Sequence, residues 1–304
     1  MKVLFQKTMA IVALTAVYSL FTGGSLCFAQ KGQAEPNAGV IRFASGADVV
    51  SAYHLRGLIF EDNGLIMKPW AAAQVNLHTL SGHGLIERVN FKLLALGSIH
   101  SEGTTATHSP RSFYEADGFA GLQVITRNNW NLEVGVHHIT WPSGTRDAAA
   151  ELYARVGYDD QVFWMRRGVA VDGFTGLRPW AMIEHEVDNT FMGMPGKRKS
   201  SFVSLGIEPA FTLVESEKMP VTLNLPITVG FGLRDYYGTR DSSFGYTKLG
   251  VIMEMPLSYV PERYGRWKMK AGVDLIWIGD SPRQYNQDHQ SFMPVAVVGL
   301  AMFY

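Results

Sequence analysis

Three acidic residues, Glu184, Glu186 and Asp188, alternate along one short stretch of the chain. In a β-strand, residues two apart point to the same face, so the three carboxylates would form one acidic row. Oxygen ligands in such a row suit a hard cation such as calcium. Acidic rows also pair with basic side chains on neighbouring strands, and Arg155 and Arg178 are available for this. We adopt the pairing interpretation and predict no metal site.

A nucleophile next to a base would indicate hydrolysis, and His138 with Thr140 has the same-face spacing for it. Threonine is a poorer candidate than serine, and nothing in the sequence marks a third member. His137 and His138 point to opposite faces, so they cannot chelate one metal from a regular strand. The sequence has no Gly-x-Ser-x-Gly, no His-Glu-x-x-His and no phosphate loop. We therefore predict no catalytic residues and no cofactor.

These residues lie on segments with a strong alternating pattern, which is clearest from Val221 to Arg234. Every odd position there is apolar, and every even position is small, polar or charged. The pattern predicts a strand with one apolar face and one polar, water-facing face. Strands of soluble proteins usually have about 5 to 6 residues, whereas a tilted membrane-spanning strand needs roughly 9 to 11. The length therefore favours a strand that crosses a membrane.

The alternation recurs along the chain, and tight turns alternate with longer polar loops, as in outer-membrane barrels. The connection Glu61–Gly64 is short where a long loop is expected. The stretch Asp160–Gly173 is long and could be an extra hairpin arm, so ten or fourteen strands remain possible beside about twelve. The expected strands are Asp48–Phe60, Leu65–Leu80, Ile86–His100, Phe113–Arg127, Trp130–Trp141, Ala148–Asp159, Phe174–Asp188, Ser201–Val214, Pro220–Arg234, Phe244–Leu257, Trp267–Ile278 and Ser291–Tyr304.

Aromatic residues at the expected strand ends form two outward belts, as suits rings with a polar tip at a membrane border. Phe119, Tyr153 and Trp180 point inward by parity and are expected to fill space. The outward set at the border nearer the termini is Trp130, Tyr158, Trp267 and Tyr304, and the opposite border has Tyr114, Trp277 and Phe292.

The first 29 of the 304 residues predict a secretory signal peptide, cleaved near Ala29. Lys2 and Lys7 are its basic start, Met9–Phe21 is its apolar stretch, and a lipoprotein through Cys27 is the less favoured alternative. Residues 30–45 would be a mobile periplasmic lead-in and 46–304 the barrel.

The balance of 27 basic and 27 acidic residues does not indicate a nucleic-acid-binding surface. No later stretch has about 20 consecutive apolar residues, which excludes a helical membrane protein.

The segment from Asp48 to Leu77 resembles the start of the TorF family of outer-membrane porins. The matching residues are Ser51, Tyr53, Arg56 and Gly57, in a Ser-x-Tyr-x-x-Arg-Gly pattern, followed by a turn and a second strand. This chain has Lys68 where many relatives carry a glutamine. The resemblance implies a porin-like outer-membrane protein, and it brings no substrate and no catalytic residues.

The sequence thus predicts an all-β fold, a single closed antiparallel transmembrane β-barrel in a Gram-negative outer membrane. Its lumen would be narrow, polar and partly filled, and would pass small polar solutes. Alternatives are a barrel enzyme acting on lipid or lipopolysaccharide, a non-conducting structural or adhesive barrel, and a secreted soluble β-protein. The pore-lining candidates are His54, Arg56, Lys68, Arg88, Lys92, Glu115, Asp117, Glu133, Arg155, Arg178, Glu184, Glu186, Asp188, Arg234, Lys248 and Lys270.

The expected partners are outer-membrane lipids, small polar solutes and the barrel-assembly machinery, which would bind the C-terminal strand ending at Tyr304. The outward face should not tolerate charge: Leu225→Arg should impair insertion, whereas Thr228→Arg on the inner face should be tolerated or alter conductance.

Overall fold

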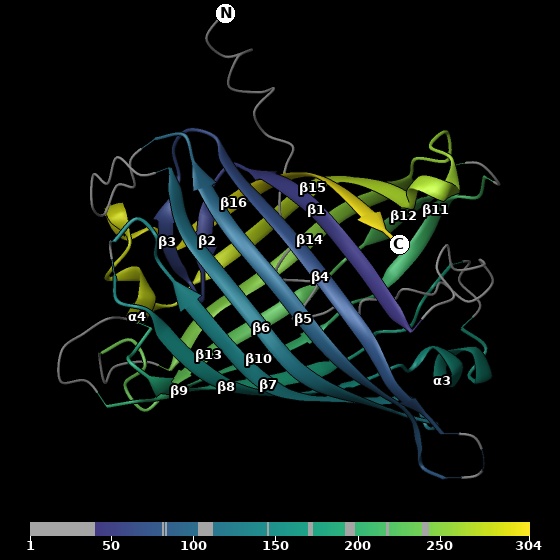
Figure 1. Ribbon diagram of the computed structural model, residues 1–304. Coiled ribbons are helices and arrows are strands. Elements are labelled where there is room, and N and C mark those ends of the chain that lie inside the picture. The colour runs from purple at the N-terminus through teal and green to yellow at the C-terminus, as the bar shows by residue number, and fades with distance from the viewer. Residues whose placement is uncertain are drawn as a thin grey trace, which may run out of the picture.

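The computed structural model describes residues 40–80, 82, 84–102, 112–144, 146–169, 173–191, 198–216, 219–238 and 243–304. Its wall is an antiparallel sheet that closes where β1 (Ile41–Val50) pairs with β16 (Phe292–Phe303), giving a twelve-strand barrel (Figure 1). Closure leaves no open sheet edge. The predicted fold class is therefore confirmed.

The uninterrupted strands between β1 and β16 are β4 (Ile66–Thr79), β5 (Ile86–His100), β6 (Phe113–Thr126), β7 (Trp130–Thr140), β8 (Ala149–Tyr158), β9 (Trp180–Asp188), β14 (Phe244–Pro256) and β15 (Arg266–Ile278).

Two wall strands are each broken into two pieces by a proline. One is β10 (Ser201–Ile207) with β11 (Ala210–Val214), and the other is β12 (Val221–Asn224) with β13 (Ile227–Leu233). Pro209 and Pro226 lie at the breaks, because proline has no N–H to give to the ladder. The breaks are adjacent, since the Leu225 N–H donates to the Pro209 carbonyl at 2.9 Å.

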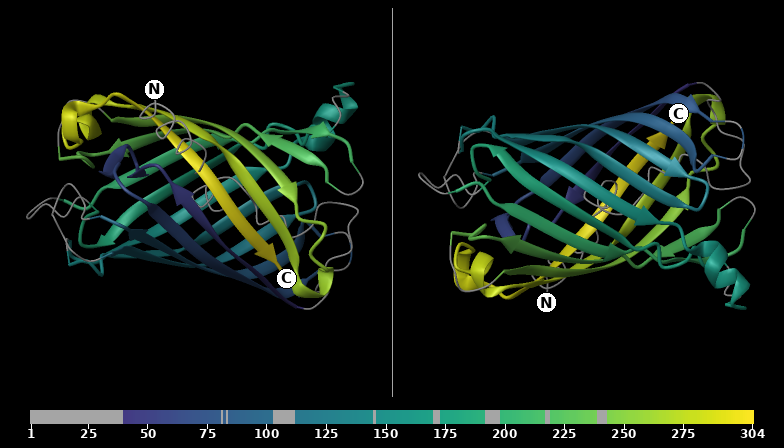
Figure 2. Two further views of the ribbon diagram at one scale, coloured as in Figure 1. Left: turned by 90° about the horizontal axis from the view of Figure 1, so that it is seen from above. Right: turned by 90° about the horizontal axis from the view of Figure 1, so that it is seen from below.

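The first wall strand is not the expected Asp48–Phe60. It is β1, and the chain leaves the wall after it and forms a small hairpin of β2 (Tyr53–Leu55) and β3 (Leu58–Glu61). The hairpin forms a sheet of its own, and it lies within the outline of the barrel near the end that carries α4 in both views of Figure 2. The connection that looked too short at Glu61–Gly64 is thus part of a longer loop folded inward.

The weak pattern of β1 explains the error. Small residues fill its centre, Ala44 to Ala47, so the contrast between its two faces is low. The hairpin segment alternates only from Tyr53 to Gly57, is apolar throughout Leu58 to Phe60, and buries most of its apolar side chains in the packed lumen rather than facing lipid. The wall also begins at Ile41, so the expected lead-in 30–45 overlaps β1, and the expected signal peptide 1–29 lies outside the described residues.

The stretch Asp160–Gly173 does not form a hairpin arm in its described part. It contains a short helix, α3 (Gln161–Arg166), and β9 begins only at Trp180 instead of Phe174. The other helical turns are η1 (Glu262–Tyr264), α4 (Asp280–Arg283) and η2 (Gln287–His289). Among the described residues, no helix has the length and apolar character to cross a membrane.

The two faces of the wall differ as predicted. On β13, Thr228 is 3% exposed and points inward, whereas its neighbour Val229 lies on the outer face. Large apolar side chains in the middle of other strands are open on the outside, for example Val134 at 57% and Leu152 at 50%. Apolar surface of this extent around a closed sheet fits hydrocarbon rather than water.

One predicted belt residue faces the wrong way. Tyr114 was expected on the outer face, but it is 1% exposed and packs edge-on against the Tyr53 ring inside the barrel. A register shift between β5 and β6, at Ser98 and Ile99, moves the first residues of β6 out of the simple alternation. At the opposite end, the outward rings of Trp130 and Tyr158 lie 4.9 Å apart between centroids, as one piece of the expected belt.

Candidate functional site in the barrel lumen

Arg56, at the turn of the inward hairpin, is the centre of the charged cluster in the lumen. Its side chain has no exposed surface. Nη1 and Nη2 donate to the two carboxylate oxygens of Glu151 on β8, at 2.7 and 2.5 Å. Nη2 also lies 2.9 Å from Oε1 of Glu184 on β9, and Nη1 donates to the Tyr236 hydroxyl. Paired parallel hydrogen bonds of this kind are the strongest form of arginine–carboxylate contact.

Three aromatic rings surround the same guanidinium. Its Cζ lies 4.9 Å from the Phe191 ring centroid, 5.1 Å from that of Phe202 and 5.6 Å from that of Tyr236. Each of these distances is within the range of a cation–π contact, which gains strength where water is excluded. The guanidinium group of Arg56 is therefore held by hydrogen bonds in its plane and by three aromatic rings around it.

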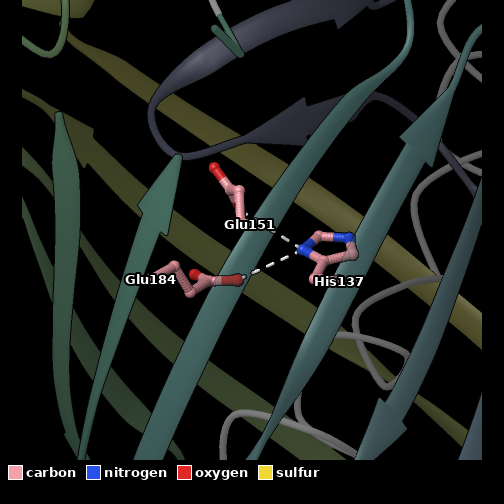
Figure 3. Close-up of side chains that lie close together, drawn as sticks. All are labelled: His137, Glu151 and Glu184. Carbon is pink, nitrogen blue, oxygen red and sulfur yellow. Dashed lines mark hydrogen bonds and ion pairs between the residues drawn. The ribbon is translucent and has the colours of Figure 1, made fainter. Parts of the chain in front are cut away.

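His137 on β7 lies beside the carboxylates of Glu151 and Glu184 in the cluster (Figure 3). Its Nδ1 lies 3.2 Å from Oε1 of Glu184 and 3.4 Å from Oε2 of Glu151, and the Phe119 ring stacks on it at 3.8 Å. One ligand atom each from His137, Glu151 and Glu184 lie within 4.8 Å of one another, which is compatible with a metal ion. In this structure the Arg56 guanidinium supplies positive charge to both carboxylates.

Further contacts hold the hairpin in the lumen. The Tyr53 hydroxyl donates to Glu115 on β6, and Lys68 Nζ lies 4.3 Å from the Tyr53 ring centroid. On the opposite side, Asn286 Nδ2 donates to the Gly57 carbonyl at 2.9 Å, and its Oδ1 accepts from the Ile59 N–H at 2.8 Å. The hairpin is thus held through both of its strands, at Tyr53 on β2 and at Ile59 on β3.

A loop tyrosine anchors the turn itself. The Tyr237 hydroxyl donates to the Arg56 carbonyl at 2.7 Å. Burial raises the pKa of the Tyr237 hydroxyl well above its ordinary value, so the donor stays protonated. The turn needs this support because Arg56 has φ of 53°, in the left-handed region that a non-glycine residue seldom adopts, and Gly57 follows with φ of 84°.

Deeper in the lumen, charged side chains pair with one another. Lys92 Nζ lies 2.7 Å from Glu133 Oε2, and the Tyr153 hydroxyl donates to the other oxygen of Glu133 at 2.8 Å. Lys248 Nζ lies 3.4 Å from Asp274 Oδ2. Cross-strand ion pairs of this kind hold neighbouring parts of the wall together. Phe119, Tyr153 and Trp180 point inward and fill space, as expected.

The acidic row behaves differently from the expected pairing with Arg155 and Arg178. Glu184 contacts Arg56 and His137. Glu186 accepts hydrogen bonds from the backbone N–H groups of Phe191 and Ser200, at 2.7 and 2.8 Å. Asp188 is exposed at the end of β9. The row therefore ends at the rim, and its partners come from the hairpin, from His137 on β7 and from loops.

The structure brings several predicted residues together. Arg56 and Glu184, two of the pore-lining candidates, join Glu151 and His137 in the cluster above, and the strand parity of these last two residues also directs them inward. His54 and Arg56 belong to the hairpin and not to the wall, and Arg234 lies exposed beyond the end of β13. Candidates on the inner side of wall strands are Lys68, Arg88, Lys92, Glu115, Asp117, Glu133, Arg155, Glu184, Glu186, Lys248 and Lys270, with Arg178 just before β9.

Sequence reasoning missed the aromatic half of the cluster. Phe191 and Tyr236 lie in loops, where no alternation marks a direction. The pair Tyr236–Tyr237 in a polar loop was the one available hint, because aromatic rings in such loops need burial. The hydroxyl of Thr140, one half of the possible catalytic pair, donates to the Ala116 carbonyl at 2.8 Å.

No protein-family model matches the chain, and no curated protein matches it. The fold is similar to the beta domain of the Bordetella autotransporter BrkA, with 10% identity, 88% of this chain and 99% of that chain covered, and a TM-score of 0.39. It is similar to the NanC porin, with 6% identity, 86% and 98% covered, and a TM-score of 0.43. It is also similar to a bacterial polysaccharide outer membrane secretin, with 9% identity, 87% and 98% covered, and a TM-score of 0.38.

The closed wall, its apolar outer surface and its charged interior define the class of protein, which is a transmembrane β-barrel. The comparisons do not confirm the resemblance of Ser51 to Gly57 to the TorF family, so that membership stays an expectation.

Proposed function

We propose that this chain is a porin-like barrel of a Gram-negative outer membrane, whose lumen is closed by the hairpin β2–β3 and passes small polar solutes when the hairpin moves. The observation that carries the proposal is the arrangement around Arg56. A loop of the barrel lies across the lumen and is held there by side-chain contacts, while charged groups line the wall behind it.

The charged interior supports a passage over a purely structural barrel. A barrel whose role was only to be stable would gain from apolar packing, since removing charges from water costs several kcal/mol per ion. Lys92, Glu133, Lys248 and Asp274 are all nearly buried, and they lie together as a Lys–Glu and a Lys–Asp pair. With the hairpin released, charged groups of both signs along the lumen would select solutes by charge and size.

Conductance in planar lipid bilayers tests the proposal. The wild-type barrel is compared with a variant in which residues 53–61 are replaced by a short glycine–serine link. We expect brief openings in the wild type and a larger, steadier conductance in the variant. Both proteins are first checked for the heat-dependent gel migration of a folded barrel. If neither conducts, the chain is a non-conducting structural barrel and the proposal is wrong.

A further inference from the structure

The pocket around Arg56 is built by the wall and its loops, and Arg56 enters it from elsewhere. Glu151 and Glu184 project from β8 and β9, and Phe202 from β10. Phe191 and Tyr236 come from the loops after β9 and β13. The hairpin contributes the guanidinium of Arg56, and its Phe60 ring packs edge-on against Phe191 from outside the pocket. The pocket and the guanidinium that fills it thus come from separate segments of the chain, as a binding site and its ligand do.

The contacts of the pocket are specific for a planar cation. Glu151 faces the guanidinium with both oxygens, and Glu184 takes a further N–H. An ammonium group cannot make the parallel pair of hydrogen bonds, because its donors are not arranged in a fork. The three aromatic faces also suit a weakly hydrated, flat cation better than a strongly hydrated point charge.

The carboxylates of Glu151 and Glu184 favour a bound cation. If the hairpin withdrew, Glu151 and Glu184 would face the opened lumen next to His137 with the arginine charge removed. Two carboxylates this close together repel each other, so the open lumen would favour a cation at this position. The backbone of Arg56 supports the same view, since its φ of 53° favours glycine, and the contacts of its side chain offset that cost.

We propose that the pocket formed by Glu151, Glu184, Phe191, Phe202 and Tyr236 is a binding site for small guanidinium compounds that enter the lumen, and that Arg56 occupies it when the hairpin is seated. The inference rests on the proposed passage, and it names the solute class of that passage: monovalent cations with a planar guanidinium group. Release of the hairpin and binding of the solute are then alternatives at one site.

Chemical rescue tests this site. Arg56→Gly removes the side chain and suits the left-handed turn. Methylguanidinium, at concentrations too low to denature protein, is titrated into the folded variant in detergent and followed by calorimetry. We expect saturable binding of one molecule per barrel, with methylammonium binding at least about tenfold more weakly because it lacks the fork. Glu151→Gln in the same background should abolish the binding.

Three results would overturn the inference: no saturable binding, equal binding after Glu151→Gln, or a preference for Zn²⁺ over methylguanidinium. The last would assign His137, Glu151 and Glu184 to a metal instead. A second measurement uses the wild type, in case the variant does not fold. Methylguanidinium should compete with Arg56 and speed chymotrypsin cleavage at Tyr53 or Phe60 of the released hairpin, and an unchanged cleavage rate would count against the site.

The outcome is separable from that of the conductance experiment. A barrel that conducts but does not bind methylguanidinium keeps the proposed passage and loses this site. A barrel that binds methylguanidinium in the Arg56→Gly variant but stays silent in bilayers keeps the site as a binding pocket and loses the passage.

Discussion

Lys270 on β15 reaches across β16 to Asp48 on β1, with 2.9 Å between Nζ and Oδ1. The residue between them is Gly299, which is in register with both. A Cβ at that glycine would lie 2.1 Å from Asp48 Oδ1 and 2.4 Å from Lys270 Cε. The ion pair thus bridges the seam where the barrel closes, and it exists because β16 has no side chain at that point.

Gly299→Ala should therefore weaken the seam. The new methyl group would push the two charged side chains apart in a buried setting, and breaking such a pair costs roughly 3–5 kcal/mol. Gly118→Ala is the matched control, because a Cβ there meets no atom within 4 Å. The measurement is the urea midpoint of the barrel in lipid vesicles. Equal midpoints for both variants would show that the bridge over Gly299 contributes little.

The pair Lys92–Glu133 should show strong coupling. Lys92→Met leaves the Glu133 carboxylate buried and hydrogen-bonded to the Tyr153 hydroxyl without the lysine charge, which should cost about 3–5 kcal/mol of unfolding free energy. Adding Glu133→Gln should recover much of that loss, because no uncompensated charge remains. A double-mutant cycle in urea measures the coupling, and simple additivity of the two changes would contradict the prediction.

Depth in the membrane should decide the cost of a charge on the outer face. Val134 is 57% exposed in the middle of β7, and Val187 is 37% exposed near the end of β9. Val134→Arg should destabilise the barrel by about 2–4 kcal/mol, whereas Val187→Arg should cost about 0–1 kcal/mol. Folding into vesicles of defined thickness gives both values. Similar costs at both positions would mean that the outer face is not surrounded by hydrocarbon.

Asn286 should control how often the hairpin leaves the lumen. Asn286→Ala removes a donor to the Gly57 carbonyl and an acceptor for the Ile59 N–H, and each unpaired buried group costs about 1–3 kcal/mol. The released fraction should rise about tenfold or more, measured as native-state chymotrypsin cleavage of the hairpin. Asn63→Ala is the control, since its amide bonds to Asp62 at the surface. An Asn286→Ala rate equal to that of the control would place the restraint elsewhere.

Alternation was sufficient to predict the wall, because lipid outside and polar groups inside impose opposite demands on successive residues. It gave the sidedness of Thr228 and Val229 and the inward direction of Glu184. It failed at β1, where Ala44 to Ala47 are too small to distinguish the two faces. It failed again at Tyr114, where a register shift changes parity without a mark in the sequence.

The cluster in the lumen was predicted in part. Parity placed Arg56 and Glu184 inside, but it gave no distance along or across the lumen. The first hairpin strand alternates as a wall strand does, and what places the hairpin in the lumen is its contacts with residues as remote in sequence as Asn286 and Tyr237. Such long-range packing is decided by the assembled barrel and not by local pattern.

The hairpin belongs to the first part of the chain, yet the groups that seat it come later: Glu151, Tyr237 and Asn286 are separated from it by between 95 and 229 residues. Its docking place is complete only once these later segments are in position. We therefore expect seating to come late in biogenesis, after a stage in which the bore of the nascent barrel is unobstructed.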